Sequence, residues 1–121
     1  MLTLEKLKEY GADVDVGMSR CANNEKLYIR LVGVMIAEFS SGALGEALAA
    51  GDLDRAFAIA HKLKGGVNNL ALTPIAGPLC ELTELLRNKT PGDCDALYAV
   101  IIRKANSLPR CKKAMRRFSY S

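Results

Sequence analysis

The sequence of 121 residues contains no tryptophan, one histidine and four prolines, and only 6% of its residues are aromatic. It also lacks a CxxC pair, because the four cysteines are far apart and lie mostly within apolar helical patterns: Cys21, Cys80, Cys94 and Cys111. With half of the residues apolar, the chain does not need the disulfide framework that holds many small secreted domains together. We therefore predict buried, reduced thiols, and we expect no metal site.

Membrane and nucleotide-binding features are absent as well. No uninterrupted apolar run approaches the roughly 18 residues of a membrane span, and the first residues, Met1–Glu9, lack the long apolar core of a signal peptide. The chain has no Gly-rich phosphate loop and is too short to add a nucleotide-binding domain, which excludes an ATP-dependent kinase within it. We expect a cytoplasmic protein that does not bind a membrane.

The positive charge is concentrated at one end of the chain. Residues 1–108 contain 12 Lys/Arg and 13 Asp/Glu, whereas residues 109–121 contain five Lys/Arg and no acidic residue. A nucleic-acid-binding body usually shows a basic face or stripe, and the nearly neutral body shows none. We predict one domain over residues 1–108 followed by a basic tail, 109–121, that is a solvated extension, and we expect no nucleic-acid partner.

The apolar residues recur at helical spacing along nearly the whole chain, and the alternation typical of strands is absent. The sequence therefore predicts an all-α fold, an antiparallel four-helix bundle with additional short helices near the N-terminus. The expected segments, in chain order, are a helix near Thr3–Tyr10, a turn-rich stretch Ala12–Ser19, a helix from Asn23 or Asn24 to Phe39, a brief helix Ala43–Ala50, a helix Leu53–Asn69 capped by Asp52, a helix after an N-cap at Thr73-Pro74, and a helix opened by Asp93 or Asp95 that reaches about Leu108.

His61, the only histidine, lies in the middle of the helix expected over Leu53–Asn69. At roughly 100° per residue, its side chain is turned about 130° away from the centre of the apolar stripe, so the imidazole should reach solvent. Phe57, Lys64 and Gly65 are three or four residues away and should border it on the same surface. An unperturbed imidazole, with a pKa of about 6.5, is largely neutral near pH 7 and can act as a nucleophile.

Two adjacent glycines, Gly65 and Gly66, follow in mid-helix, where each costs about 1 kcal/mol relative to alanine. A glycine one turn beyond an exposed histidine leaves room for a partner's active site to approach the imidazole. Helix packing is the alternative explanation, and it applies more to Gly66 than to Gly65.

The run Ala60-His61-Lys62-Leu63-Lys64-Gly65 resembles the A-H-x-L-K-G signature of the histidine-containing phosphotransfer (HPt) domain. The similarity extends over about residues 10–108, including Gly51-Asp52 and the stretch Gly17–Arg20. It implies a four-helix bundle that carries a phosphoryl group between receiver domains without hydrolysing ATP. It also implies no cofactor of its own, since the receiver supplies the Mg²⁺ and the aspartate.

Site roles follow from the resemblance position by position. His61 is expected to be the phosphoacceptor, Lys64 the cation that assists the phosphoryl group, and Gly65 the clearance residue; the receiver is expected to dock on the surrounding face, which contains Phe57, Lys62 and Asn68. One position departs from the family. Ala71 stands where a glycine is common, so we expect the end of this helix to be capped differently, through Asn68 or Asn69.

Two other functions were weighed against phosphotransfer. A cysteine hydrolase that pairs a thiol with His61 needs an orienting third group and a pocket, which an exposed helical histidine does not supply. A non-catalytic adaptor that binds a signalling partner through the same face is the serious alternative. Pure docking, however, requires neither His61 nor Lys64.

Overall fold

The computed structural model describes residues 3–89 and 94–108. Within these ranges the chain forms seven α-helices and no β-strand: α1 (Leu4–Tyr10), α2 (Val14–Arg20), α3 (Glu25–Ser40), α4 (Ala43–Ala49), α5 (Leu53–Asn69), α6 (Thr73–Arg87) and α7 (Cys94–Asn106). The all-α fold class is confirmed. The basic tail, residues 109–121, and Asp93, one of the two expected starts of the last helix, lie outside the described residues.

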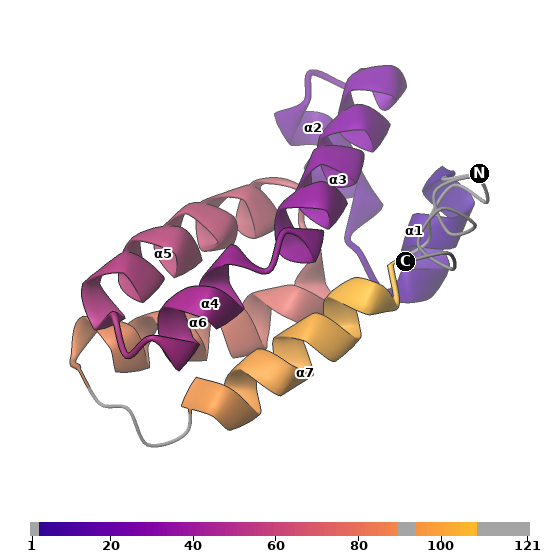
Figure 1. Ribbon diagram of the computed structural model, residues 1–121. Helices are drawn as coiled ribbons and strands as arrows, with labels where there is room; N and C mark the ends of the chain where they lie inside the picture. Colours follow the sequence, from indigo (N-terminus) through magenta and orange to yellow (C-terminus); the bar gives the residue numbers. More distant parts are fainter. Residues whose placement is uncertain (1–2, 90–93, 109–121) are drawn as a thin grey trace.

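The bundle is built around α6, which packs against α5 on one side and α7 on the other (Figure 1). The short helix α4 packs against both α5 and α7, and α3 also contacts both. Gly42, with a left-handed φ of 74°, separates α3 from α4. Together, α3 and α4 therefore occupy the fourth position of the bundle, while α1 and α2 lie outside it at the N-terminal end.

Side-chain caps define where several helices begin. Thr3, Asp13, Asn24 and Asp52 each precede a helix, and the side chain of each accepts a hydrogen bond from the backbone N–H three residues later. Such caps stabilise a helix by about 1 kcal/mol each. Of the two candidates for the start of α3, the structure selects Asn24, and the cap at Asp52 is confirmed.

The prediction of a turn-rich stretch over Ala12–Ser19 was wrong, because Val14–Arg20 is helical. Asp13 caps this helix, and Gly17 allows it to pack closely: a Cβ at Gly17 would lie 2.5 Å from Cε1 of Tyr28 and 2.8 Å from the carbonyl oxygen of Leu70. Gly17, which suggested a turn, is therefore a residue that allows close packing. The two aspartates that also suggested turns lie at the start of the helix. Tertiary contact overrode the local signal.

The start of α6 also differs from the expectation. Its N-cap is Leu72 rather than Thr73, which is the first helical residue, and Pro74 lies within the first turn, where its missing N–H is not needed. The helix continues through Pro78 to Arg87.

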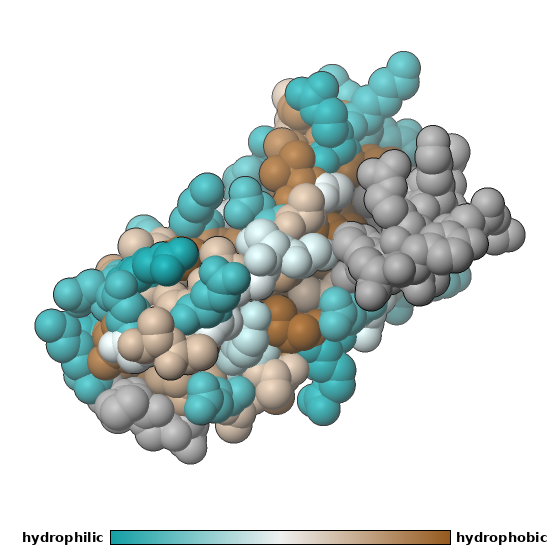
Figure 2. Space-filling view, viewed as in Figure 1, coloured by the Kyte–Doolittle hydropathy of each residue, from teal (hydrophilic) through white to brown (hydrophobic). Residues whose placement is uncertain are grey.

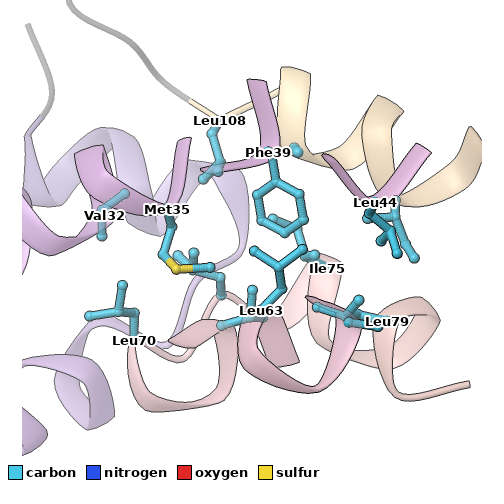
Figure 3. Packing of buried hydrophobic residues seen from close by; sticks show 14 of the residues in the cluster. Val32, Met35, Phe39, Leu44, Leu63, Leu70, Ile75, Leu79 and Leu108 are labelled. Carbon is cyan, nitrogen blue, oxygen red and sulfur yellow. The ribbon is translucent and has the colours of Figure 1, made fainter. Parts of the chain in front are cut away.

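The core is a single cluster of apolar side chains drawn from every helix (Figure 3). The labelled members come from α3 to α6 and from two positions outside the helices, one just after α5 and one after α7. They are Val32, Met35, Phe39, Leu44, Leu63, Leu70, Ile75, Leu79 and Leu108. Cys21 and Cys94 are buried, as predicted, whereas Cys80 is only half-buried; none of the three forms a disulfide within the described residues, and Cys111 lies outside them.

The C-terminal end of α5 is closed by backbone hydrogen bonds. The N–H of Leu72 donates to the carbonyl of Val67, and the N–H of Ala71 donates to the carbonyl of Asn68, which is the Schellman arrangement. Ala71 itself has a left-handed φ of 55°. The expectation of an alternative cap through the side chain of Asn68 or Asn69 was therefore wrong: alanine adopts the backbone conformation that glycine usually provides.

Neighbouring helices hold this end of α5 in place. The buried Tyr28 hydroxyl donates to the carbonyl of Leu70 at 3.0 Å, the N–H of Asp13 donates to the carbonyl of Ala71 at 2.9 Å, and the guanidinium of Arg20 donates to the carbonyl of Asn68. Burial raises the pKa of Tyr28, with smaller contributions from Cys21 and Asp13, so its hydroxyl stays protonated as the donor. These contacts explain why the left-handed Ala71 is tolerated.

One stretch, Glu25–Ala49, meets the length and hydropathy criteria for a membrane span, because a window of 18 residues within it has a mean hydropathy of 1.4. Charged residues such as Arg30 and Glu38 interrupt it, so it is not a continuous apolar run. The stretch comprises α3 and α4, which are separated at Gly42, and core helices of soluble proteins pass the same test. It is weak evidence for a membrane segment. On the face shown in Figure 2, hydrophilic and apolar residues are interspersed, and the most apolar colour gathers near α2 and α3.

Candidate functional site

His61 is exposed on the outer surface of α5. The opposite side of the same helix is buried, and its apolar stripe consists of Ala56, Ala60, Leu63 and Val67. The prediction that the imidazole reaches solvent is confirmed. In the part of the chain that the structure describes, neither ring nitrogen of His61 takes part in a hydrogen bond.

Phe57, one turn before His61, is half-buried and contacts the imidazole. The two ring centroids are 5.7 Å apart and the planes are tilted by 43°. From α6, the guanidinium carbon of Arg87 lies 5.7 Å from the centroid of the same phenyl ring. Arg87 also forms an ion pair with Glu84 at 3.2 Å. The site therefore includes the last turn of α6 as well as α5.

The two lysines next to His61 have different surroundings. Lys62 approaches Glu38 of α3, with 3.9 Å between its Nζ and Oε1, and its side chain is 76% exposed. Lys64 is half-buried and forms no ion pair with any described residue. Three residues after His61, it lies on the same side of the helix. Lys64 therefore offers an uncompensated positive charge beside the imidazole, whereas the charge of Lys62 is partly balanced.

The adjacent glycines face opposite kinds of space. A Cβ at Gly65 would have no atom within 4 Å, whereas a Cβ at Gly66 would lie 2.6 Å from Sδ of Met35. Gly65 thus keeps the surface beside His61 low, and Gly66 permits the close approach of α3. Each glycine matches one of the two explanations given from the sequence.

The expected site residues lie on one face of α5 with one exception. By the helical angle of about 100° per residue, Phe57, Lys64, Gly65 and Asn68 all fall within about 60° of His61, while Lys62 is turned about 100° away, toward α3. Asn68 is exposed, and its backbone carbonyl is held by Arg20 from α2.

Sequence reasoning did not identify Glu38, Glu84 or Arg87 as neighbours of this face. The spacing of Glu84 and Arg87 suggests a pair within one helix, but only the packing of α6 on α5 brings Arg87 to Phe57. The contact between Lys62 and Glu38 likewise depends on how α3 crosses α5.

The described ranges contain no cluster of three or more His, Cys, Asp or Glu side chains that could hold a metal ion. A groove of about 730 Å³ lies between α6 and α7, lined by Cys80, Glu81, Glu84, Leu85, Ala96, Leu97 and Val100, and His61 is not part of it. The chemistry available at His61 is therefore that of an open surface rather than of an enclosed pocket.

Comparison with known families gives one match: residues 41–117 match the family described as "Hpt domain". The matched range includes more than half of the chain and contains α4 to α7, and hence His61 and its surroundings on α5 and α6. Among curated proteins and solved structures, no match was found.

Proposed function

Because the chain belongs to the Hpt domain family, whose members are phosphocarriers in two-component signalling, we propose that it accepts a phosphoryl group on His61 from the aspartate of one receiver domain and passes it to another. Hpt domains have no kinase activity of their own, and they are generally soluble. We place this relay in the cytoplasm.

One observation carries the proposal. The only histidine of the chain is exposed in mid-helix, its ring nitrogens form no hydrogen bond with the described residues, and one turn later comes a glycine beside which there is open space. Phosphoryl transfer from a second protein needs a nucleophile that the partner's active site can reach directly. A histidine buried for stability would lack this access.

The proposed transfer exchanges one bond for another. The imidazole nitrogen without a hydrogen attacks the phosphorus of the receiver's aspartyl phosphate, an N–P bond forms, and the P–O bond to the aspartate breaks with its electron pair returning to the carboxylate. Transfer to the next receiver reverses these steps. Lys64 would stabilise the negative oxygens of the phosphoryl group during transfer, and the receiver would supply the Mg²⁺.

The receiver would dock on the face defined by Phe57, Lys64, Gly65 and Asn68, with Lys62 at its α3 edge. Its partners would be the receiver domains of response regulators or of hybrid histidine kinases. The low surface at Gly65 supports an approach over this side of the imidazole.

The test is phosphotransfer from purified, radiolabelled receiver domains to the full chain. We expect the wild type to take up a label that is acid-labile and alkali-stable, as a phosphoramidate is, and His61→Gln to take up none while its melting temperature stays unchanged. Undiminished labelling of His61→Gln would contradict the proposal.

The adaptor alternative makes a different prediction in the same experiment. An adaptor would bind receiver domains through this face with similar affinity in the wild type and in His61→Gln, and neither protein would become labelled.

A further inference from the structure

Phe57 contacts two functional groups that come from different helices. Its ring centroid is 5.7 Å from the centroid of the His61 imidazole and 5.7 Å from the guanidinium carbon of Arg87. Both distances are within the ranges for aromatic pairs and for cation–π contacts. We propose that Arg87, acting through Phe57, positions the imidazole of His61 for phosphoryl transfer, an inference that rests on the proposed function of His61.

The imidazole needs such a contact because nothing else described in the structure orients it. Neither ring nitrogen takes part in a hydrogen bond to the residues described. A hydrogen bond would fix the ring but would also occupy a nitrogen. Contact with the Phe57 ring restricts the rotation of His61 and leaves both nitrogens available to a partner.

Arg87 is suited to hold the phenyl ring of Phe57 in place. Its planar guanidinium can stack on an aromatic face and donate to a carboxylate at the same time, which a lysine ammonium does less well. The carboxylate is that of Glu84, one turn earlier on α6, at 3.2 Å. A chain of contacts therefore runs from Glu84 through Arg87 and Phe57 to His61.

These contacts contribute little to the stability of the bundle. The side chains of Arg87 and Glu84 are 49% and 55% exposed, and exposed ion pairs stabilise proteins only weakly. The two helices are held together by their buried residues and are also linked at the same end by Lys89 and Asp54, with 3.8 Å between Nζ and Oδ1. Replacing Arg87 should therefore leave the fold intact, so that effects on His61 can be measured.

Proton NMR of the free protein tests the positioning directly. His61 is the only histidine, so its Hδ2 and Hε1 protons give the only histidine ring resonances, and the ring current of Phe57 shifts them. In Arg87→Ala we expect both resonances to move toward their positions in Phe57→Leu. The matched control Lys89→Ala, which removes a cation of the same helix end that touches Asp54 instead of Phe57, should leave them unchanged. Unchanged resonances in Arg87→Ala would overturn the inference.

Phosphorylation kinetics separate positioning from docking. Arg87→Ala should slow phosphohistidine formation about threefold to tenfold, below the roughly 100-fold that a 1 Å misplacement can cost, and by a similar factor with a phosphorylated receiver and with the small donor phosphoramidate. Slowing with the receiver alone would make Arg87 a docking contact and contradict positioning. Arg87→Lys should recover part of the rate.

A double-mutant cycle tests whether Arg87 acts on His61 through Phe57. In the Phe57→Leu background, Arg87→Ala should have no further effect on the rate, because its influence passes through the phenyl ring. Full additivity of the two substitutions would contradict the inference. If the wild type accepts no label from any donor, the proposed function fails, whereas the NMR comparison still decides whether Arg87 orients the ring.

Discussion

Gly65 and Gly66 are neighbours in α5, yet they belong to two different regions of the molecule. Gly65 lies on the exposed face with His61, where an added Cβ would meet open space, and Gly66 lies against α3, where an added Cβ would meet Met35 at 2.6 Å. Both lower the helix propensity by similar amounts. Only at Gly66 does close packing offset the loss of helix stability that the glycine causes.

The exposed face of α5 and its C-terminal end, against which α2 and α3 pack, therefore have different roles. At the C-terminal end, Gly66 and Gly17 allow helices to approach closely, and the Tyr28 hydroxyl donates to the carbonyl of Leu70 just after α5. On the exposed face, Gly65 has no packing partner, and within the described chain neither ring nitrogen of His61 takes part in a hydrogen bond. The proposed docking of a receiver domain on this face would account for both residues.

Gly65→Gln should produce the largest effect and the clearest separation of the two regions. The longer side chain would stand beside the imidazole, so receiver-dependent phosphotransfer should fall by about 100-fold or more, while the melting temperature holds or rises because a glycine has left the helix. Gly65→Ala serves as the control with a smaller loss. Unfolding of Gly65→Gln, seen by circular dichroism, would show that Gly65 is a packing residue after all.

Gly66→Leu should show the opposite pattern. The new side chain overlaps the buried Met35, and overpacking of this kind costs about 1–3 kcal/mol of unfolding free energy. Urea titration followed by circular dichroism measures the loss, and transfer by the folded fraction should stay close to that of the wild type. A variant as stable as the wild type would mean that α3 and Met35 yield without cost, and the contrast between the two glycines would disappear.

Lys64→Ala should slow phosphotransfer about tenfold or less, since it removes a charge near the phosphoryl group but leaves the approach to His61 open. Lys62→Ala is the comparison, because Lys62 is turned toward Glu38 at the edge of the docking face and should slow transfer less than Lys64→Ala. Single-turnover labelling compares the two. Equal slowing by both substitutions would indicate a general effect of positive charge on receiver binding.

Ala71→Gly should stabilise the protein by about 1 kcal/mol, because a left-handed conformation costs an L-residue roughly 1–2 kcal/mol and glycine avoids most of that cost. Gly51→Ala is the reverse control. Gly51 has a φ of 70° and open space around its Cβ position, so alanine there should destabilise the protein by a similar amount. Thermal melts report both changes, and phosphotransfer should not change. A loss of stability in Ala71→Gly would show that its methyl group contributes more by packing than the backbone conformation costs.

The sequence by itself determined the helical class, most helix limits, the cap at Asp52 and the exposure of His61. These depend on periodicity and on hydrogen bonds within a few residues, which are properties of a single segment. The receiver-docking roles of the site residues remain predictions from resemblance.

Only the tertiary structure decided that residues 14–20 are helical, that Ala71 adopts a left-handed conformation, and that Arg87 reaches Phe57. Each of these depends on how one helix meets another: Tyr28 against Gly17 and the end of α5, and the last turn of α6 against α5. Helical periodicity shows which face of a helix is buried. It does not show which residue of another helix lies opposite, because the packing of the whole core sets that register.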